Sequence, residues 1–231
     1  MNCDPYKVVR DFEAALCEYT GAKYAVTTTS CTMALLLAVK WFLYGRYGRD
    51  GVILRPGGLG DELPYIEIPK HTYISVPMSI IHAGGWPVFR DDDWQGAYQL
   101  KPLPVWDCAR MFTSGMFNNI TASEIALRES GTFNKMQCVS FHASKILGDT
   151  QGGSILHDND EADAWLRRAR FDGRTEGIAP KDDRFTQIGF HCYLSPDVAA
   201  RLLLKLSVLP AYNDDLPNDE YPDLSKMEIF Q

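Results

Sequence analysis

Short apolar segments rich in β-branched residues alternate with amphipathic segments along most of this chain, and this alternation restricts the fold more than any other feature. The apolar segments have the length of strands, and the segments between them repeat apolar residues as helices do. Strands are expected at 23–30, 63–69, 86–93, 103–107, 136–141 and 152–157, helices at 5–19, 30–45, 75–85, 160–171 and 195–209, and a glycine-rich loop at 45–62. This order predicts an α/β domain with a mostly parallel sheet, whose ligands bind at the carboxyl ends of the strands.

Charge and cysteine usage narrow the class of protein. The 231 residues carry a formal net charge of −7, so nucleic acid is not expected as a partner, because binding its backbone requires a basic surface. No apolar run is long enough to span a bilayer and no signal-peptide core is present, so no membrane partner is expected. The six cysteines lie far apart without a C-x-x-C pair, which favours reduced thiols in a cytoplasmic protein.

Polar residues follow three of the expected strands. The first group is Ser30, Cys31 and Thr32, where a strand runs into a helix. Free backbone N–H groups and hydroxyls at the start of a helix form a natural phosphate site. The same residues also suit simple helix capping, and this stretch alone does not decide between the two.

Asp107 is the second polar residue, at the carboxyl end of the strand 103–107. A carboxylate there can be a hydrogen-bonded core residue, a metal ligand or the partner of a protonated ring nitrogen. A metal is disfavoured, because no His/Asp cluster has ligand spacing and the three acids 91–93 are typical of a solvated turn. We therefore predict no metal site.

Lys145 is the third, just beyond Ser140, with the glycine pair 152–153 after it. A lysine above a pocket has its pKa lowered by desolvation and by neighbouring positive charge, and it can then form a Schiff base. A phosphate site, a single carboxylate and a lysine at successive strand ends together match the requirements of pyridoxal 5'-phosphate. The combination is more specific than any one of its parts.

These residues resemble a known family. The chain is similar to the DegT/DnrJ-type sugar aminotransferases, fold-type I pyridoxal-phosphate enzymes, and is an unusually short member. The similarity covers most of residues 8–209, and its most specific motif is Ser-Phe-His-x-x-Lys followed by Gly-Gly, within 140–153. It implies the large domain of an aspartate-aminotransferase-like fold, with the small C-terminal domain largely absent.

The resemblance also implies roles. Lys145 would hold the cofactor as the internal aldimine and then move a proton between Cα and C4′. Asp107 would pair with the pyridinium nitrogen, and Tyr73 would stack on the ring. Ser140, with Cys31 and Thr32 at the helix start, would bind the phosphate, and Ser30 beside them is counted as a cofactor-binding residue.

Two matched positions depart from the family pattern. Arg110 stands where the family has Gln or His, and it would favour the phenolate of the cofactor, grip a substrate carboxylate, or point to solvent or a surface acid. His191 stands where the family has an Asn that reaches across the dimer to the phosphate. A histidine can also donate there, or it is a packed loop residue. We count both as cofactor-binding residues and expect a homodimer.

The short length bears on the substrate. Residues 1–210 are expected to form the cofactor-binding domain, and the acidic segment 211–231 a loose arm or a strap for a partner. Without a small domain, the favoured reaction is ping-pong transfer from a small amino acid, such as a dibasic one, to a keto acid. The alternatives are a keto nucleotide-sugar acceptor and a non-catalytic binding protein. A dehydratase is disfavoured, because family dehydratases replace the lysine with His.

Overall fold

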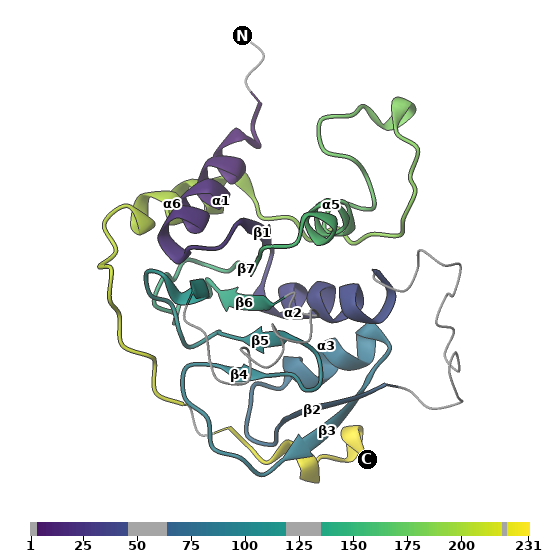
Figure 1. The fold of residues 1–231 in the computed structure, drawn as a ribbon, viewed down its shortest axis with the longest axis vertical. Coiled ribbons are helices and arrows are strands. Elements are labelled where there is room, and N and C mark those ends of the chain that lie inside the picture. Colours follow the sequence, from purple (N-terminus) through teal and green to yellow (C-terminus); the bar gives the residue numbers. More distant parts are fainter. Residues whose placement is uncertain (1–3, 46–63, 119–134, 219–220) are drawn as a thin grey trace.

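The computed structural model describes residues 4–45, 64–118, 135–218 and 221–231, so almost all of the expected loop at 45–62 lies outside the described residues. A five-stranded sheet with the order β1-β7-β6-β5-β4 forms the centre (Figure 1). Its strands are β1 (Tyr24–Thr28), β4 (Tyr98–Gln99), β5 (Val105–Asp107), β6 (Met136–Ser140) and β7 (Gly153–His157). A parallel pair of strands, β2 (Tyr65–Pro69) and β3 (Trp86–Arg90), continues this sheet through a bridge between Glu67 and Lys101.

The expectation of a mostly parallel sheet is wrong, because the sheet is mixed. Strand β7 lies antiparallel between β1 and β6, and β4 is antiparallel to β5, so among the described strands of the central sheet only β5 and β6 pair in parallel. The physical reason is that a loop, rather than a crossover helix, joins β6 to β7 and returns the chain in the opposite direction. Strands β1, β5 and β6 still run the same way, so their carboxyl ends share one edge.

Helices cover both faces of the sheet. The described α-helices are α1 (Lys7–Thr20), α2 (Cys31–Lys40), α3 (Ser75–Ala83), α5 (Asp160–Ala169) and α6 (Pro196–Leu206). Neighbouring residues of a strand point to opposite faces, and in β6 Cys138 packs in the core with α2 whereas Val139 packs in the core with α1 and α6. A sheet covered on both faces explains why every residue of β7, and every residue of β6 except Ser140, is buried.

A buried ion-pair cluster ties α1 to β1 and α5. Glu13 accepts hydrogen bonds from the Thr27 amide at 3.0 Å and from Arg167 at 2.8 Å, and it also pairs with Arg170. Burial alone would raise the pKa of Glu13, but the two guanidinium groups outweigh burial and lower it to about 2. The apolar stripe of α1 gave no sign that an acid would be buried beside it.

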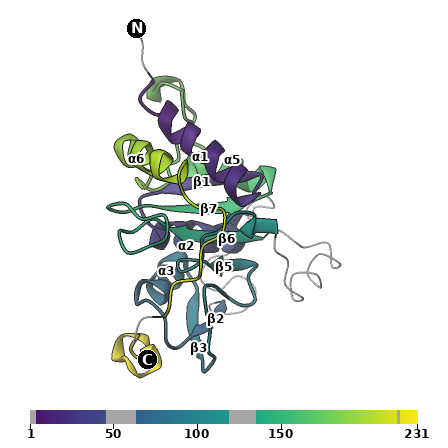
Figure 2. The same ribbon diagram turned by 90° about the vertical axis from the view of Figure 1, so that its left-hand side faces the viewer.

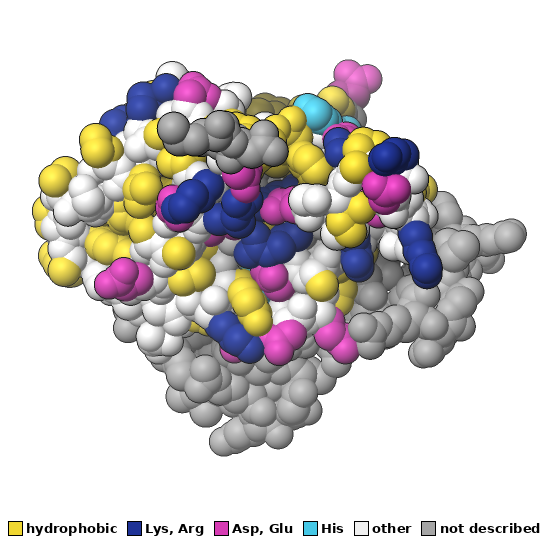
Figure 3. Space-filling model, turned by 90° about the horizontal axis from the view of Figure 1, so that it is seen from above, with side chains coloured by type: hydrophobic (Ala, Val, Ile, Leu, Met, Phe, Trp, Pro, Cys, Tyr) yellow, Lys and Arg dark blue, Asp and Glu magenta, His cyan; other side chains and the backbone are white. Residues whose placement is uncertain are grey.

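One face of the molecule carries mixed charge. On the face seen from above, basic and acidic side chains are interspersed rather than separated (Figure 3). Close to the start of α1, Lys7 pairs with Asp11 and Arg10 with Asp4. Among the described helices, none combines the length and the apolar character that crossing a bilayer would require.

The expectation of a loose arm at 211–231 is also wrong. In its described parts this segment runs from α6 past the edge of the central sheet to β2 and β3 (Figure 2). Leu224 and Phe230 are buried, and the Phe230 ring lies 5.6 Å from that of Phe89. The acidic composition predicted exposure, but these apolar residues, spaced among the acids, are what the segment buries.

Candidate active site

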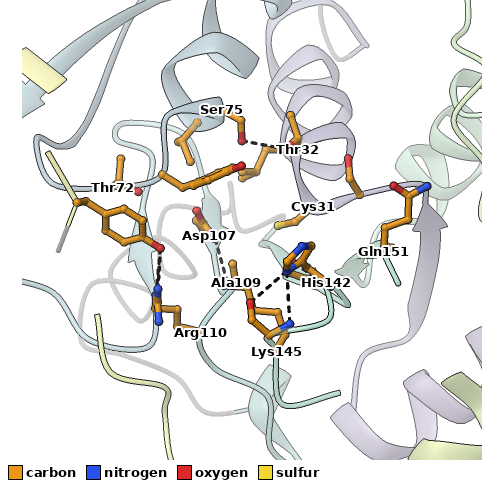
Figure 4. Close-up of a pocket in the computed structure, with 18 of the residues that line it drawn as sticks. Cys31, Thr32, Thr72, Ser75, Asp107, Ala109, Arg110, His142, Lys145 and Gln151 are labelled. Atoms are coloured by element: carbon orange, nitrogen blue, oxygen red, sulfur yellow. Dashed lines mark hydrogen bonds between the residues drawn. The ribbon is translucent and has the colours of Figure 1, made fainter. Parts of the chain in front are cut away.

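A cavity of ≈ 390 Å³ opens where β1, β5 and β6 end (Figure 4). It brings together residues that are far apart in the sequence, as the strand directions require. All the predicted site residues except His191 line it, namely Ser30, Cys31, Thr32, Tyr73, Asp107, Arg110, Ser140 and Lys145. The structure therefore brings these residues together in one cavity, and their roles stay predictions.

The start of α2 forms one end of the cavity. Ser30 caps the helix, because its hydroxyl accepts a hydrogen bond from the Met33 amide at 3.2 Å. The Thr32 and Ser75 hydroxyls lie 2.9 Å apart, and burial raises the pKa of the Cys31 thiol well above its usual value. The first N–H groups of a helix have no partner within it. Capping by Ser30 is therefore compatible with an anion held by the backbone and by Thr32.

The glycine pair after Lys145 has a steric explanation. A Cβ on Gly153 would lie 2.5 Å from the backbone nitrogen of Cys31 and 2.5 Å from the carbonyl carbon of Ser30. Only a residue without a side chain lets β7 approach the start of α2 this closely. Gly153 thereby allows the start of α2 to pack closely against the edge of the sheet.

Asp107 is buried at the centre of the cavity wall. Its Oδ2 accepts a hydrogen bond from the Tyr98 hydroxyl at 2.9 Å, and its Oδ1 accepts one from the Ala109 amide at 2.9 Å. Burial raises the pKa of Asp107, although these hydrogen bonds and the charges of Lys145 and Arg110 act in the opposite direction. A carboxyl with this balance can share a proton with a ring nitrogen. Across the described ranges, no group of three or more metal-ligating side chains comes together.

Sequence reasoning missed the hydroxyl network behind Asp107. The Tyr98 hydroxyl also lies 2.6 Å from the Thr72 hydroxyl. Burial and the Asp107 carboxyl raise the pKa of Tyr98 well above its usual value, so the phenol keeps its proton and can donate. Tyr98 lies in the segment 94–103, where the only sequence signal was an aromatic residue two places from a glycine.

Lys145 is half-buried on the loop 141–152 between β6 and β7. The loop is anchored to α6, because the Asp149 carboxylate pairs with Arg201 at 2.8 Å and with Lys205 at 3.0 Å. His142, which had no assigned role, lines the cavity, and its Nδ1 lies 3.1 Å from the Ser144 hydroxyl. The lysine is thus held by a loop that is fixed to a helix.

Arg110 is buried, so the alternative in which it points to solvent is wrong. Its Nη2 and Nε donate to the Tyr221 hydroxyl at 2.8 and 3.2 Å, and its Nη1 donates to the Pro217 carbonyl. Tyr221 also lines the cavity, near the exposed ring of Tyr73. Sequence reasoning missed Tyr221 because it treated the whole segment as an exposed arm.

His191 lies apart from the cavity that the same chain forms. It is exposed, and its Nδ1 is 2.8 Å from an Asp172 carboxylate oxygen. The expected role across a dimer stays a prediction.

Comparison with known proteins identifies the class. The fold is that of fold-type I pyridoxal-phosphate-dependent aminotransferases. The family model of the DegT/DnrJ/EryC1/StrS aminotransferase family matches residues 3–106 and 103–215. The chain belongs to this family, whose members depend on pyridoxal phosphate, as the sequence predicted.

Individual relatives are longer. SpsC of Bacillus subtilis, a spore coat polysaccharide biosynthesis protein, is 40% identical over 182 residues, 66% of this chain and 42% of SpsC. UDP-4-amino-4,6-dideoxy-N-acetyl-beta-L-altrosamine transaminase of Campylobacter jejuni is 24% identical over 226 residues, 85% of this chain and 55% of that protein. The solved structure of Helicobacter pylori PseC, an aminotransferase involved in pseudoaminic acid biosynthesis, matches with a TM-score of 0.64 at 18% identity, covering 87% of this chain and 57% of that one. The chain spans about half the length of the curated relatives it matches.

Proposed function

We propose that the protein transfers an amino group with pyridoxal phosphate, and that its acceptor is the carbonyl of a nucleotide-linked keto sugar. The observation that carries the proposal is the convergence of Lys145, Asp107 and the start of α2 on one cavity. The relatives reported above give no support to the small amino acid donor or to the keto-acid acceptor that the sequence favoured. The name of the Campylobacter jejuni relative, a transaminase of a UDP-linked amino sugar, supports the sugar alternative instead.

The residues present fit the cofactor. Pyridoxal phosphate, when bound, supplies an aldehyde that reacts with amines and a ring that withdraws electrons from the reacting carbon. The backbone N–H groups at the start of α2, with the hydroxyls of Thr32 and Ser140, would bind the phosphate. Asp107 would keep the ring nitrogen protonated, because the positive charge of the ring would stabilise the carboxylate against the burial that raises its pKa.

Lys145 would move the proton of the reaction. An amine in the same cavity as the substrate can take a proton from the donor's Cα and deliver it elsewhere, provided that it is held close and correctly oriented. The ion pairs of Asp149 with Arg201 and Lys205 hold the loop for this purpose. Lys145 and Asp107 would then act from the same cavity on different atoms of the bound group.

All the proposed cofactor ligands in the cavity of this chain lie within residues 1–210, which we propose as the cofactor-binding unit.

A homodimer is also proposed. Because His191 is exposed and lies away from the cavity, it could meet a phosphate only in a second copy of the chain. Equilibrium sedimentation with and without cofactor would test this.

Absorbance titration with pyridoxal phosphate tests the cofactor site. The wild type should develop the band of a lysine-bound aldehyde, and Lys145→Ala should not. Pre-loading with an amino donor, followed by a keto-sugar nucleotide or by pyruvate, then tests the acceptor. Faster turnover with pyruvate would overturn the sugar acceptor, and an identical band in Lys145→Ala would overturn the cofactor site.

A further inference from the structure

The segment that follows α6 is bonded along the rim of the cavity. We call its described residues, 211–218 and 221–231, the tail strap. The Ala211 carbonyl accepts from the Ser114 amide at 2.8 Å, the Leu216 amide donates to the Arg110 carbonyl at 2.9 Å, and the Leu224 amide donates to the Lys70 carbonyl at 3.0 Å. The partners Arg110 and Ser114 come after β5 in the chain, and the partner Lys70 comes directly after β2. Main-chain hydrogen bonds at these separate points give the strap a fixed path past the cavity.

Arg110 contacts the strap more than once. Its carbonyl accepts from the Leu216 amide, and its guanidinium donates to the Pro217 carbonyl and to the Tyr221 hydroxyl. A planar guanidinium that bonds two separate residues fixes their relative positions better than a single flexible donor would. Arg110 is therefore placed to clamp the strap.

Tyr221, which Arg110 holds, forms part of the cavity wall. Tyr221 lines it together with Lys145 and Asp107. Its ring lies 6.5 Å from Trp94, nearly parallel at 14°, and 6.5 Å from Tyr73, and its carbonyl lies 2.9 Å from Nδ1 of His71. Three aromatic rings thus form one side of the cavity. Rigid aromatic walls restrict the size and shape of what a pocket accepts.

We propose that Tyr221 is a specificity-determining residue of this site, and that Arg110 is the positioning residue that holds it in place through the tail strap. The group selected is the part of the acceptor beyond its reacting carbonyl, that is, the sugar ring and what is attached to it. This inference rests on the proposed function for its ligand, whereas the clamp itself is a property of the protein without cofactor.

Hydrogen exchange on the cofactor-free protein tests the clamp. Replacing Arg110 by lysine, Arg110→Lys, should speed exchange at the Leu216 and Leu224 amides at least tenfold, and Tyr221→Phe should act in the same direction by removing the hydroxyl. Tyr212→Phe is the matched control, since its hydroxyl bonds Asp214 within the strap and its side chain is exposed. Unchanged protection of β6 would show that the domain stays folded. Unchanged exchange at Leu216 and Leu224 in Arg110→Lys would overturn the clamp.

The ratio of kcat/KM for a keto-sugar nucleotide to that for pyruvate tests the wall. Tyr221→Ala should change this ratio at least tenfold relative to the wild type, whereas Tyr212→Ala should leave it within twofold. An unchanged ratio in Tyr221→Ala, with the wild type active, would overturn the specificity role alone. A wild type that uses neither acceptor would instead reject the proposed function and the specificity role with it, and the exchange experiment would still decide the clamp.

Discussion

The Tyr98 phenol donates a hydrogen bond to the Asp107 carboxyl at 2.9 Å, in a place where both side chains are buried. The hydrogen-bond donors to this buried carboxyl, the Tyr98 hydroxyl and the Ala109 amide, are neutral. The positive charges of Lys145 and Arg110 lower its pKa, but by less than burial raises it. The site is therefore built to receive a positive group at Asp107, at a cost to the protein that lacks one.

Asp107→Asn should separate that cost from the binding function. Because burial raises the folded-state pKa of Asp107 above 3.8, its contribution to stability is present below pH 3.8 and is lost as the pH rises through the folded-state value. The variant should lack this loss, so that its thermal midpoint at neutral pH equals or exceeds that of the wild type. Its affinity for pyridoxal phosphate should fall at least tenfold. A lower midpoint without loss of affinity would argue for a purely structural Asp107.

Tyr98→Phe should lower the free energy of unfolding by disrupting the hydrogen bonds around Asp107. It removes one donor to Asp107 and the partner of the Thr72 hydroxyl, and leaving buried groups unpaired costs about 1–3 kcal/mol. Urea unfolding should show this loss, whereas Tyr65→Phe, at an exposed tyrosine, should show almost none. Equal effects of the two substitutions would contradict the assigned network.

Glu13→Gln should remove part of the acid sensitivity of the fold. With a pKa lowered from 4.5 to about 2, ionised Glu13 contributes stability that is fully present above pH 4.5 and is lost as the pH falls through about 2. Breaking the buried cluster should cost about 3–5 kcal/mol near neutral pH, and less in acid. His157, whose pKa burial lowers to about 3, also destabilises the fold below pH 6.5. The difference between wild-type and variant denaturant curves therefore isolates Glu13, and a difference independent of pH would be the contrary result.

Gly153→Ala should damage the end of the cavity where we propose that the phosphate binds. The added methyl would overlap the backbone of Ser30 and Cys31, which cannot move without shifting α2 from the sheet edge. Affinity for pyridoxal phosphate should fall by tenfold or more. Gly177→Ala is the control for strain away from the cavity, because its backbone has a φ of +80°, which disfavours a side chain, whereas its Cβ would have nothing within 4 Å. Similar affinities for the two variants would count against the close approach of β7 to α2.

The sequence allowed Lys145, Asp107 and the start of α2 to be placed together for two reasons. The apolar residues of each strand stop at a definite position, and strands that run in the same direction end at the same edge of the sheet. The sequence could not give the direction of β7, which depends on how the loop 141–152 returns the chain. Tyr98 and Tyr221 escaped because their roles come from contacts between distant segments, with no local pattern. The burial of Leu224 was not predicted for a related reason. The many acidic residues of the segment indicated exposure, and two apolar residues, Leu224 and Phe230, were too few to indicate packing.

The position of β1 has a consequence for how the chain matures. It lies at the edge of the central sheet, where Val26 faces Ile155 of β7, so a strand near the amino end takes its ladder partner from far along the chain. Contacts of such long sequence separation are slow to form. During synthesis, β1 cannot form this ladder until β7 has left the ribosome, and the end of the cavity at the start of α2, where we propose that the phosphate binds, cannot be complete before then. Binding of the cofactor would therefore indicate that β7 has paired with β1. A nascent or truncated chain that ends before Gly153 should not bind the cofactor.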